Sequence, residues 1–370
     1  MIGLLPFLMA DIDIVPGSVQ KVSQVTGETD RERKRPTDNR TETRFGLRGT
    51  DLGASFEHEG RLAFLFGDTH PNGPNTPERP FDGDSIAFCD DKDPDNGLNL
   101  DFVTAADGKY ATVQIPNVST RGFEVPNGGF SHNGYLYVFF TTDAQPNPFG
   151  MLMGRSILIR SKDAKSWELV YTLSTDRFIN VSPVIVDAAK TPGLPVSSGE
   201  GLLMWATGRE YRRSSPHLAF VPLDKVDDRS AIRYWTGDGR WSPREGDSRQ
   251  LFHHPMVGEI SVAWNDAVQR WVMMYNVEQP RTILLRTSPT PFGPWTDAKV
   301  VMQAKDAFGK YIHEGGTKDG LNDPGREDGN GDAYAPYLIP RFFKPDGTIY
   351  FLMSLWNPYN VVLMRAKLTK

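Results

Sequence analysis

The sequence predicts an all-β chain that folds into a five-bladed β-propeller. Turn-forming residues are abundant, with 28 Pro and 35 Gly among 370 residues. Strand-favouring aromatic residues make up 11% of the chain, and a hairpin of two apolar runs recurs five times along it. Many short strands joined by turns indicate a sandwich or a repeating all-β fold. Radial repetition of four-stranded sheets protects strand edges, so we favour the propeller and keep a β-sandwich as the alternative.

The hairpins define the expected blades in order. Each joins two apolar runs through a short turn, except the third, which has a longer loop. They occupy residues 49–69, 128–142, 181–207, 259–275 and 337–353. A third strand is expected after each hairpin, at residues 85–88, 156–160, 218–221, 283–286 and 361–368. Fourth strands follow in several units, including residues 167–173 and 299–303. The last unit has none, so residues 18–25 are expected to close the ring.

The domain organisation follows from this repeat. Residues 18–370 form one predicted propeller domain, and residues 1–17 precede it as an N-terminal segment. Its first part, residues 1–10, is apolar but lacks a basic region and a convincing cleavage site, so we interpret it as the remnant of a secretion signal. A secreted or cell-envelope location is the corresponding expectation, which the sequence leaves open. The lone Cys89 excludes an internal disulfide framework.

Charge and hydropathy exclude two classes of partner. A net charge of −5 gives no reason to expect nucleic acid binding. No apolar run reaches the roughly 18 residues that a membrane span requires. We therefore expect no nucleic-acid partner and no membrane span, and we expect the chain to be a monomer.

Asp51 and Asp68 are the most informative pair of residues. Folding about the Glu59-Gly60 turn of the first hairpin brings them into cross-strand register at its open end. Paired side chains there have Cβ atoms about 4.5–5.5 Å apart. Two carboxylates so close cannot both ionise cheaply, so the pKa of one is expected to rise well above the usual Asp value. Such a pair suits acid/base or nucleophilic chemistry on a sugar, whereas turn capping or a structural cation is the alternative.

The start of each first strand and the end of each second strand are expected on one rim of the propeller. Reading those positions across the repeats predicts a rim rich in carboxylates, amides, aromatic residues and one Arg. Amides bind sugar hydroxyls, and aromatic faces pack on sugar rings. The predicted substrate-binding residues are Glu124, Asn127, Arg209, Asn276, Trp356, Asn357 and Tyr359. Core packing is an equal alternative for Trp356 and Tyr359, and Glu210 is an alternative partner for Arg209.

Glu259 is the third predicted catalytic residue. It occupies the repeat position of Asp51, the same number of residues before the turn of its own hairpin, and heads an apolar strand. We predict no cofactor and no metal at the site, because no His pair has the spacing of a zinc motif. A structural calcium ion at residues 328–332 is the alternative, since oxygen ligands alternate there. That loop nevertheless lacks the Gly and the distant Glu of an EF-hand.

Four motifs resemble a known family. They are Gly49-Thr50-Asp51-Leu52-Gly53, Phe66-Gly67-Asp68-Thr69, Gly258-Glu259-Ile260-Ser261 and Ser354-Leu355-Trp356-Asn357-Pro358-Tyr359. Together they resemble the bacterial and actinobacterial domain DUF4185, over roughly residues 44–368. That family is similar to five-bladed propeller glycosidases, and some members are placed among endo-acting D-arabinofuranases. Those enzymes cut the D-arabinan of mycobacterial arabinogalactan and lipoarabinomannan. The resemblance implies that Asp51 and Asp68 are the catalytic carboxylates.

Mechanism and function class stay open between alternatives. A direct Asp51–Asp68 pair suits the separation of about 5–5.5 Å typical of retaining glycosidases, whereas a wider pairing with Glu259 favours inversion. The leading prediction is a glycoside hydrolase acting on a furanoside-rich polysaccharide. A non-catalytic carbohydrate-binding propeller would use the same side chains as hydroxyl acceptors or cation ligands. Sialidase-like hydrolysis is disfavoured, because it needs an Arg cluster and usually six blades, and only residues 209–213 suggest such a cluster.

Overall fold

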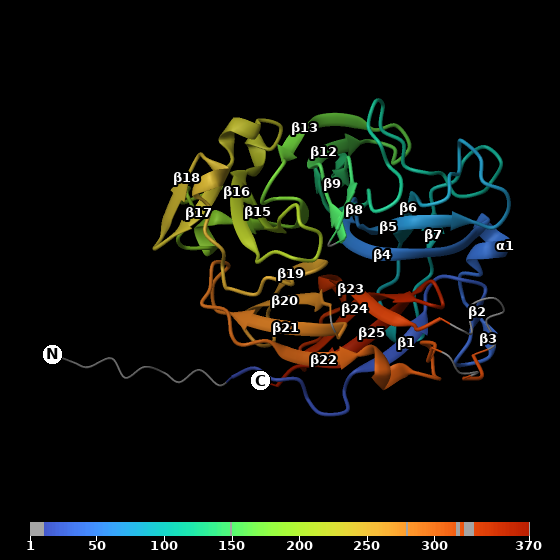
Figure 1. Cartoon of the computed structure of the whole chain (residues 1–370). Coiled ribbons are helices and arrows are strands. Elements are labelled where there is room, and N and C mark those ends of the chain that lie inside the picture. The colour runs from blue at the N-terminus through green and yellow to red at the C-terminus, as the bar shows by residue number, and fades with distance from the viewer. Residues whose placement is uncertain (1–10, 149, 279, 316–318, 322–328, 370) are drawn as a thin grey trace.

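The structure is a computed structural model that describes residues 11–148, 150–278, 280–315, 319–321 and 329–369. Five antiparallel sheets follow one another along the chain and form a ring (Figure 1). This confirms the predicted all-β fold with five blades. Residues 1–10, interpreted above as a signal remnant, lie outside the described residues. Among the described residues, no helix is long and apolar enough to cross a membrane.

The blades are built from consecutive strands. The first contains β4 (Leu47–His58), β5 (Arg61–Pro71), β6 (Gly83–Cys89) and β7 (Asp101–Phe102). The second contains β8 (Pro126–His132), β9 (Tyr135–Thr142), β12 (Arg155–Ser161) and β13 (Glu168–Ser174). The third contains β14 (Asn180–Asp187), β15 (Glu200–Thr207), β16 (His217–Pro222), β17 (Arg233–Gly237) and β18 (Arg240–Ser242). The fourth contains β19 (Ile260–Asn265), β20 (Arg270–Val277), β21 (Thr282–Ser288) and β22 (Lys299–Gln303).

The fifth blade joins the two ends of the chain. It contains β23 (Asp332–Leu338), β24 (Thr348–Trp356), β25 (Asn360–Lys367) and, as its outermost strand, β1 (Gln20–Gln24). β1 pairs antiparallel with β25, with Gln24 opposite Val362. Just beyond β1, the Val361 N–H donates a hydrogen bond to Thr26 Oγ1 at 2.9 Å. The prediction that residues 18–25 close the last blade is confirmed.

Shorter elements lie in the connections. They are α1 (Thr41–Phe45), the hairpin of β2 (Thr29–Asp30) and β3 (Arg35–Pro36), and the hairpin of β10 (Gln145–Asn147) and β11 (Gly150–Leu152). Single-turn 3₁₀ helices are η1 (Pro94–Asn96), η2 (Ala188–Lys190), η3 (Leu223–Lys225), η4 (Arg229–Ala231), η5 (Glu245–Asp247), η6 (Ala304–Ala307) and η7 (Pro340–Phe342). In Figure 1, α1, β2 and β3 lie beside the first and fifth blades.

The core is divided among the gaps between neighbouring blades. Phe64 and Phe66 of β5, for example, belong to one apolar cluster with Leu352 and Leu363 of the fifth blade. Because a blade is covered on both faces, its middle strands read as continuous apolar runs rather than alternating ones. The run Leu202–Ala206 in β15 shows this, since each of its residues is 0% exposed.

Two details of the predicted strands are wrong. The first strand of the fifth blade is predicted from Tyr337, but β23 already ends at Leu338, and η7 covers Pro340 to Phe342. Pro340 has no N–H to donate to a ladder, which agrees with a turn at this position. In the first hairpin, Asp51 pairs with Gly67 and not with Asp68. The cause is a register shift between Leu52 and Ala54 in β4, close to the site described next.

Candidate active site

Asp51 lies on β4, the first strand of the first blade, where the pairing with β5 is irregular. The register shifts on both sides of Asp51, between Gly49 and Asp51 and again between Leu52 and Ala54. Such bulges twist a strand and redirect its side chains. A Cβ atom at Gly67, directly opposite, would lie 2.9 Å from Asp51 Oδ1. Glycine at this position therefore leaves the room that the Asp51 carboxyl occupies.

Asp68 lies in the same irregular stretch. Its φ of +38° is in the left-handed region, which Asp adopts more readily than most other residues. Its side chain is half-buried, whereas Asp51 is only 6% exposed. Asp84, near the start of β6, is 0% exposed, and neither of its carboxyl oxygens has a hydrogen-bond partner among the described residues. Three carboxyl groups from β4, β5 and β6 thus gather in one blade.

The electrostatics of this cluster favour the protonated acids. Burial raises the pKa of Asp51 to about 6, and the charge of Glu259 adds to the rise. Burial, followed by the charge of Asp51, raises the pKa of Asp68 well above its usual value. The pKa of Asp84 is also well above its usual value, because of burial and then the charges of Asp68 and Asp51. Asp68 and Asp84 therefore hold their protons to higher pH than an ordinary Asp does, while Asp51, with a pKa of about 6, is mostly ionised at neutral pH.

Glu259 directly precedes β19 and forms a buried ion pair with Arg212. Arg212 Nη2 lies 2.8 Å from Glu259 Oε1, and Nε lies 3.1 and 3.2 Å from the two carboxylate oxygens. The Tyr211 hydroxyl donates a further hydrogen bond to the same carboxylate. Burial alone would raise the pKa of Glu259, but the Arg212 charge and these hydrogen bonds keep it below its usual value. Glu259 therefore stays ionised in the pH range in which Asp68 is protonated.

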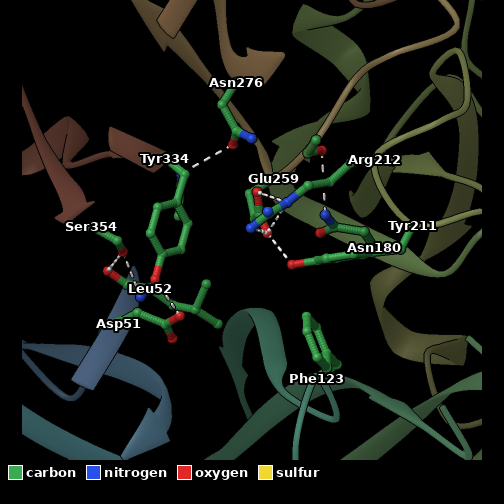
Figure 2. A network of polar contacts seen from close by, with 12 residues as sticks. Asp51, Leu52, Phe123, Asn180, Tyr211, Arg212, Glu259, Asn276, Tyr334 and Ser354 are labelled. Atoms are coloured by element: carbon green, nitrogen blue, oxygen red, sulfur yellow. Dashed lines mark hydrogen bonds and ion pairs between the residues drawn. The ribbon is translucent and has the colours of Figure 1, made fainter. Parts of the chain in front are cut away.

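Tyr334 links the acid pair to this ion pair. Its hydroxyl, on β23, donates a hydrogen bond to Asp51 Oδ2 at 2.8 Å, and the Arg212 guanidinium lies 5.1 Å from its ring centroid. Figure 2 shows the Tyr334 hydroxyl directed at Asp51, with the Arg212–Glu259 pair across from it. As hydrogen-bond donors, Tyr334 and Tyr359 both lower the pKa of Asp51 against the effect of burial. Side chains from four blades thus meet at one end of the channel.

Three of the other predicted binding residues are buried. Glu124 accepts hydrogen bonds from two backbone N–H groups, and its charge contributes to the raised pKa of Asp84. Asn276, on β20, accepts a hydrogen bond from the Ala335 N–H at 3.0 Å. Asn127, on β8, lines a cavity of about 360 Å³ in the channel, together with residues from the first strands of all five blades.

The remaining predicted residues divide between the site and its surroundings. Trp356 is 50% exposed and packs edge-on against the buried Tyr359, with 5.5 Å between ring centroids. Asn357 follows Trp356 and is buried. Arg209 is exposed, and no contact within the described residues joins its side chain to the carboxylates. The structure brings Tyr359 together with the predicted catalytic residues, and the guanidinium beside them belongs to Arg212 instead.

The sequence motifs and the family comparison agree. Residues 36–365 match the model of a domain family described as being of unknown function, DUF4185. The chain belongs to the DUF4185 family. This confirms the resemblance drawn from the four motifs. No curated protein matches the chain in sequence.

Several solved structures are similar to the DUF4185 chain. A variant of exo-β-1,3-galactanase from Phanerochaete chrysosporium with β-1,3-galactotriose matches 94% of the chain at 7% identity, with a TM-score of 0.50. The chain spans 64% of the length of that galactanase. An α-L-arabinofuranosidase from Podospora anserina has 10% sequence identity and a TM-score of 0.48. The match covers 95% of the DUF4185 chain and 98% of the arabinofuranosidase chain. A glycosyl hydrolase from Bacteroides ovatus has 11% sequence identity and a TM-score of 0.48. The match covers 98% of the DUF4185 chain and 95% of the hydrolase chain.

Sequence reasoning missed two kinds of residue in the DUF4185 site. Arg212 lies in the connection between β15 and β16, so the end of a strand does not point to it. Asp84 lies on a third strand, whereas the rim positions were taken from first and second strands. A signal for Asp84 does exist in the sequence, because a charged residue beginning an otherwise apolar strand is unusual unless it is paired or functional.

The expectation of a structural calcium ion stays a prediction. Asp328, the first residue of the loop concerned, lies outside the described residues. Within the described residues, no three His, Cys, Asp or Glu side chains are grouped so that they could hold a metal ion.

Replacing Asp84 by Asn is expected to stabilise the DUF4185 chain at alkaline pH. Because the pKa of Asp84 is raised in the folded state, the native protein binds this proton more tightly than the unfolded chain does. Stability therefore falls as pH rises above the usual Asp value of 3.8 toward the folded value. Asn has no proton to lose, so we expect a gain of about 1–3 kcal/mol near pH 8 and little change near pH 4. Urea unfolding at both pH values measures this.

Asp163→Asn is the matched control for this prediction. Asp163 is an exposed turn residue whose pKa is lowered, chiefly by hydrogen bonds from the backbone N–H groups of Ser166 and Lys165. The Asp163→Asn protein should therefore be less stable than wild type at neutral pH. An Asp84→Asn protein no more stable than wild type near pH 8 would contradict the protonated state assigned to Asp84.

Proposed function

We propose that this protein is a glycoside hydrolase that cleaves a furanoside-rich polysaccharide. The observation that carries the proposal is the Asp51–Asp68 pair, in which the pKa of Asp51 is raised to about 6 and that of Asp68 well above its usual value. Two carboxyl groups in opposite protonation states are the usual requirement for hydrolysis of a glycosidic bond. The galactanase with the same fold is named for this class of reaction.

Asp68 is the proposed general acid. It holds its proton to higher pH than an ordinary Asp does, and it is the most accessible of the three clustered aspartates. Its proton passes to the glycosidic oxygen as the bond between that oxygen and the anomeric carbon breaks. Asp51, ionised above about pH 6, attacks the anomeric carbon or removes a proton from the attacking water. The two carboxyls interact strongly, so their pKa values belong to the pair rather than to either residue alone.

Glu259 is proposed to position the pair rather than to react. Within the described part of the chain, its side-chain partners are Arg212 and Tyr211, and a carboxylate bound in this way is a weak nucleophile and a weak base. Its role is to hold the Arg212 charge beside Tyr334 and Asp51. This charge limits the rise in the pKa of Asp51 and so keeps Asp51 ionised.

The proposed substrate is the D-arabinan of mycobacterial arabinogalactan or lipoarabinomannan, cut internally. The resemblance of the four motifs to DUF4185, some members of which are placed among endo-acting D-arabinofuranases, supports this substrate. Exposed aromatic rings support a carbohydrate in general: Trp356 packs on Tyr359, and Phe123, 43% exposed, packs edge-on against Tyr211. Aromatic rings of this kind offer an apolar face to sugar rings.

Incubation of the purified protein with mycobacterial arabinogalactan tests the proposal. Released oligosaccharides are followed by chromatography, and the first anomer formed is identified by NMR, which separates retention from inversion. Oligomers released by wild type, but not by Asp51→Asn or Asp68→Asn, are the expected result. Binding without release would point to a carbohydrate-binding propeller, and neither binding nor release would exclude this substrate.

Tyr334→Phe is expected to move the acidic limb of the activity profile to higher pH. The variant removes a hydrogen bond to the Asp51 carboxylate, which is worth about 0.5–1.5 kcal/mol. The pKa of Asp51 should then rise from about 6 by up to about one unit, so activity below neutral pH falls by up to about tenfold. The dependence of kcat/KM on pH measures this shift.

Tyr171→Phe controls for the loss of a buried hydroxyl. The Tyr171 hydroxyl donates to the Val226 carbonyl at 3.1 Å, in the gap between the second and third blades. The acidic limb of the pH profile of Tyr171→Phe should coincide with that of wild type. A Tyr334→Phe profile of unchanged shape would mean that Asp51 is not the group that must ionise.

A further inference from the structure

A polar pocket of about 620 Å³ lies beside the candidate active site, between the first and fifth blades. It lies within the range of about 300–1,000 Å³ that is usual for small-molecule sites. One wall comes from the segment that connects β1 to β4, and the other comes from β4, the end of β5 and the residues after β24. The pocket and the acid pair share one side chain, that of Tyr359.

The first wall is held in place by buried hydrogen bonds. Asn39 Nδ2 donates to the carbonyl oxygens of Val25 and Leu98 at 2.8 and 2.9 Å. Thr41 Oγ1 accepts from the Gly27 N–H at 2.8 Å and donates to the Leu47 carbonyl at 3.0 Å. Buried side-chain bonds of this kind fix a connection that has little regular secondary structure. The segment is therefore a built surface and not a loose insertion.

The charges of the pocket are balanced. Glu28 and Glu42 line it together with Arg31 and Arg48. Burial and the charge of Glu28 raise the pKa of Glu42, and the charges of Arg48 and Arg31 oppose this rise, so the four groups lie close enough to interact. An anion or a cation entering here would meet two groups of its own sign. A neutral ligand rich in hydroxyl groups can instead donate to the carboxylates and accept from the guanidinium groups.

Tyr359 connects the pocket to the acid pair. Its hydroxyl is a hydrogen-bond donor to Asp51, and its ring stacks on His70 with 4.6 Å between centroids. Gly49, two residues before Asp51, allows this arrangement, because a Cβ atom there would lie 2.7 Å from the Tyr359 carbonyl oxygen. Tyr359 therefore lies between the acid pair and the pocket, contacting Asp51 with its hydroxyl and lining the pocket.

We propose that this pocket is a subsite for an uncharged sugar residue of the same polysaccharide, beyond the two residues that flank the cleaved bond. The inference rests on the proposed function and specifies its substrate: a neutral glycan long enough to reach from the acid pair into the pocket. Occupation of a remote subsite favours internal cleavage of long chains, because its binding energy is available only to them.

Hydrogen exchange of the full-length Asp68→Asn protein tests the subsite. The probe is an octasaccharide of D-arabinofuranose residues prepared from mycobacterial arabinan. Slower exchange is expected both in residues 49–72, around the acid pair, and in residues 25–48, which form the first wall. The double variant Glu42→Gln/Arg48→Ala should weaken octasaccharide binding by about tenfold, which is about 1.4 kcal/mol. It should also remove the protection of residues 25–48. Arg240→Ala, an exposed change on β18, serves as control and should leave both readouts unchanged.

The outcomes separate this inference from the proposed function. Protection of residues 49–72 alone, or equal binding by the double variant, would overturn the subsite and leave the hydrolase intact. Protection of both segments, with no oligosaccharide released by wild type, would support the sugar site and overturn the hydrolase. Protection of neither segment would overturn both the subsite and the hydrolase activity for this substrate.

Discussion

Asp68→Asn is expected to lower kcat by about 10²–10⁴-fold while the affinity for D-arabinan changes little. Asn has nearly the shape of the protonated acid but no proton to give, so the leaving oxygen must depart without assistance. The alkaline limb of the pH profile should disappear with the acid that produces it. Initial rates on arabinogalactan give kcat, and titration with arabinan oligosaccharides gives the dissociation constant.

A loss of fold is not the expected cause of this lost activity. Because the pKa of Asp68 is raised in the folded state, its removal should make the protein slightly more stable at neutral pH. Asp143→Asn is the matched control: Asp143 follows β9 on the second blade, is half exposed, and pairs with Arg155 at 2.7 Å. Its kcat should stay within about twofold of wild type, since exposed ion pairs contribute little. An Asp68→Asn enzyme that kept a tenth of wild-type kcat would assign the acid elsewhere.

Arg212→Met is expected to destabilise the protein by about 3–5 kcal/mol, because it leaves Glu259 as an unpaired charge in the interior. The side chains of Arg212 and Glu259 are 10% and 3% exposed. In the wild type, the pKa of Glu259 is below its usual value of 4.5, so its contribution to stability is present above that value and is lost as pH falls through the folded pKa. Without Arg212, burial outweighs the remaining hydrogen bonds of Glu259 and raises this pKa. The loss in free energy of unfolding of Arg212→Met, relative to wild type, should therefore grow with pH between about 5 and 8. Urea unfolding measures this loss.

Two further variants sharpen this test. Arg244→Met removes an arginine whose pair with Asp247 is exposed, with side chains 79% and 36% accessible, so its loss should stay below about 1 kcal/mol. The double variant Arg212→Met/Glu259→Gln should recover part of the deficit, since no charge is left buried. If Arg212→Met lost no more free energy of unfolding than Arg244→Met, the stability of the protein would not depend on the ion pair of Arg212 with Glu259.

The parts of the fold that local patterns determine were predictable from sequence. Apolar runs separated by turns identify the hairpins, and a last blade without a fourth strand indicates where residues 18–25 belong. The register of the first hairpin was not predictable in the same way. Counting residues from the turn includes neither its bulges nor the left-handed φ of Asp68.

The site was predictable only where it lies on strands. Asp51, Asp68 and Glu259 lie on or beside the strands expected to carry them, and the structure brings them together. The Arg that meets them lies in a connection, and Arg212 contacts Glu259 across 47 residues of sequence. The path of such a connection depends on contacts with other blades, so strand periodicity pointed to Arg209, at the end of β15, instead.

Closure of the ring by β1 has a consequence for synthesis of the chain. The contact between Thr26 and Val361 spans 335 residues, so the closing strand is made first and its partner last. At about 5–20 residues per second, β1 waits on the order of 20–70 s for β25 to be made. For this time, four blades can assemble while β23, β24 and β25, the other strands of the fifth blade, are not yet complete. The joining of the two ends of the ring is therefore a late step, whose rate can be followed separately from blade formation.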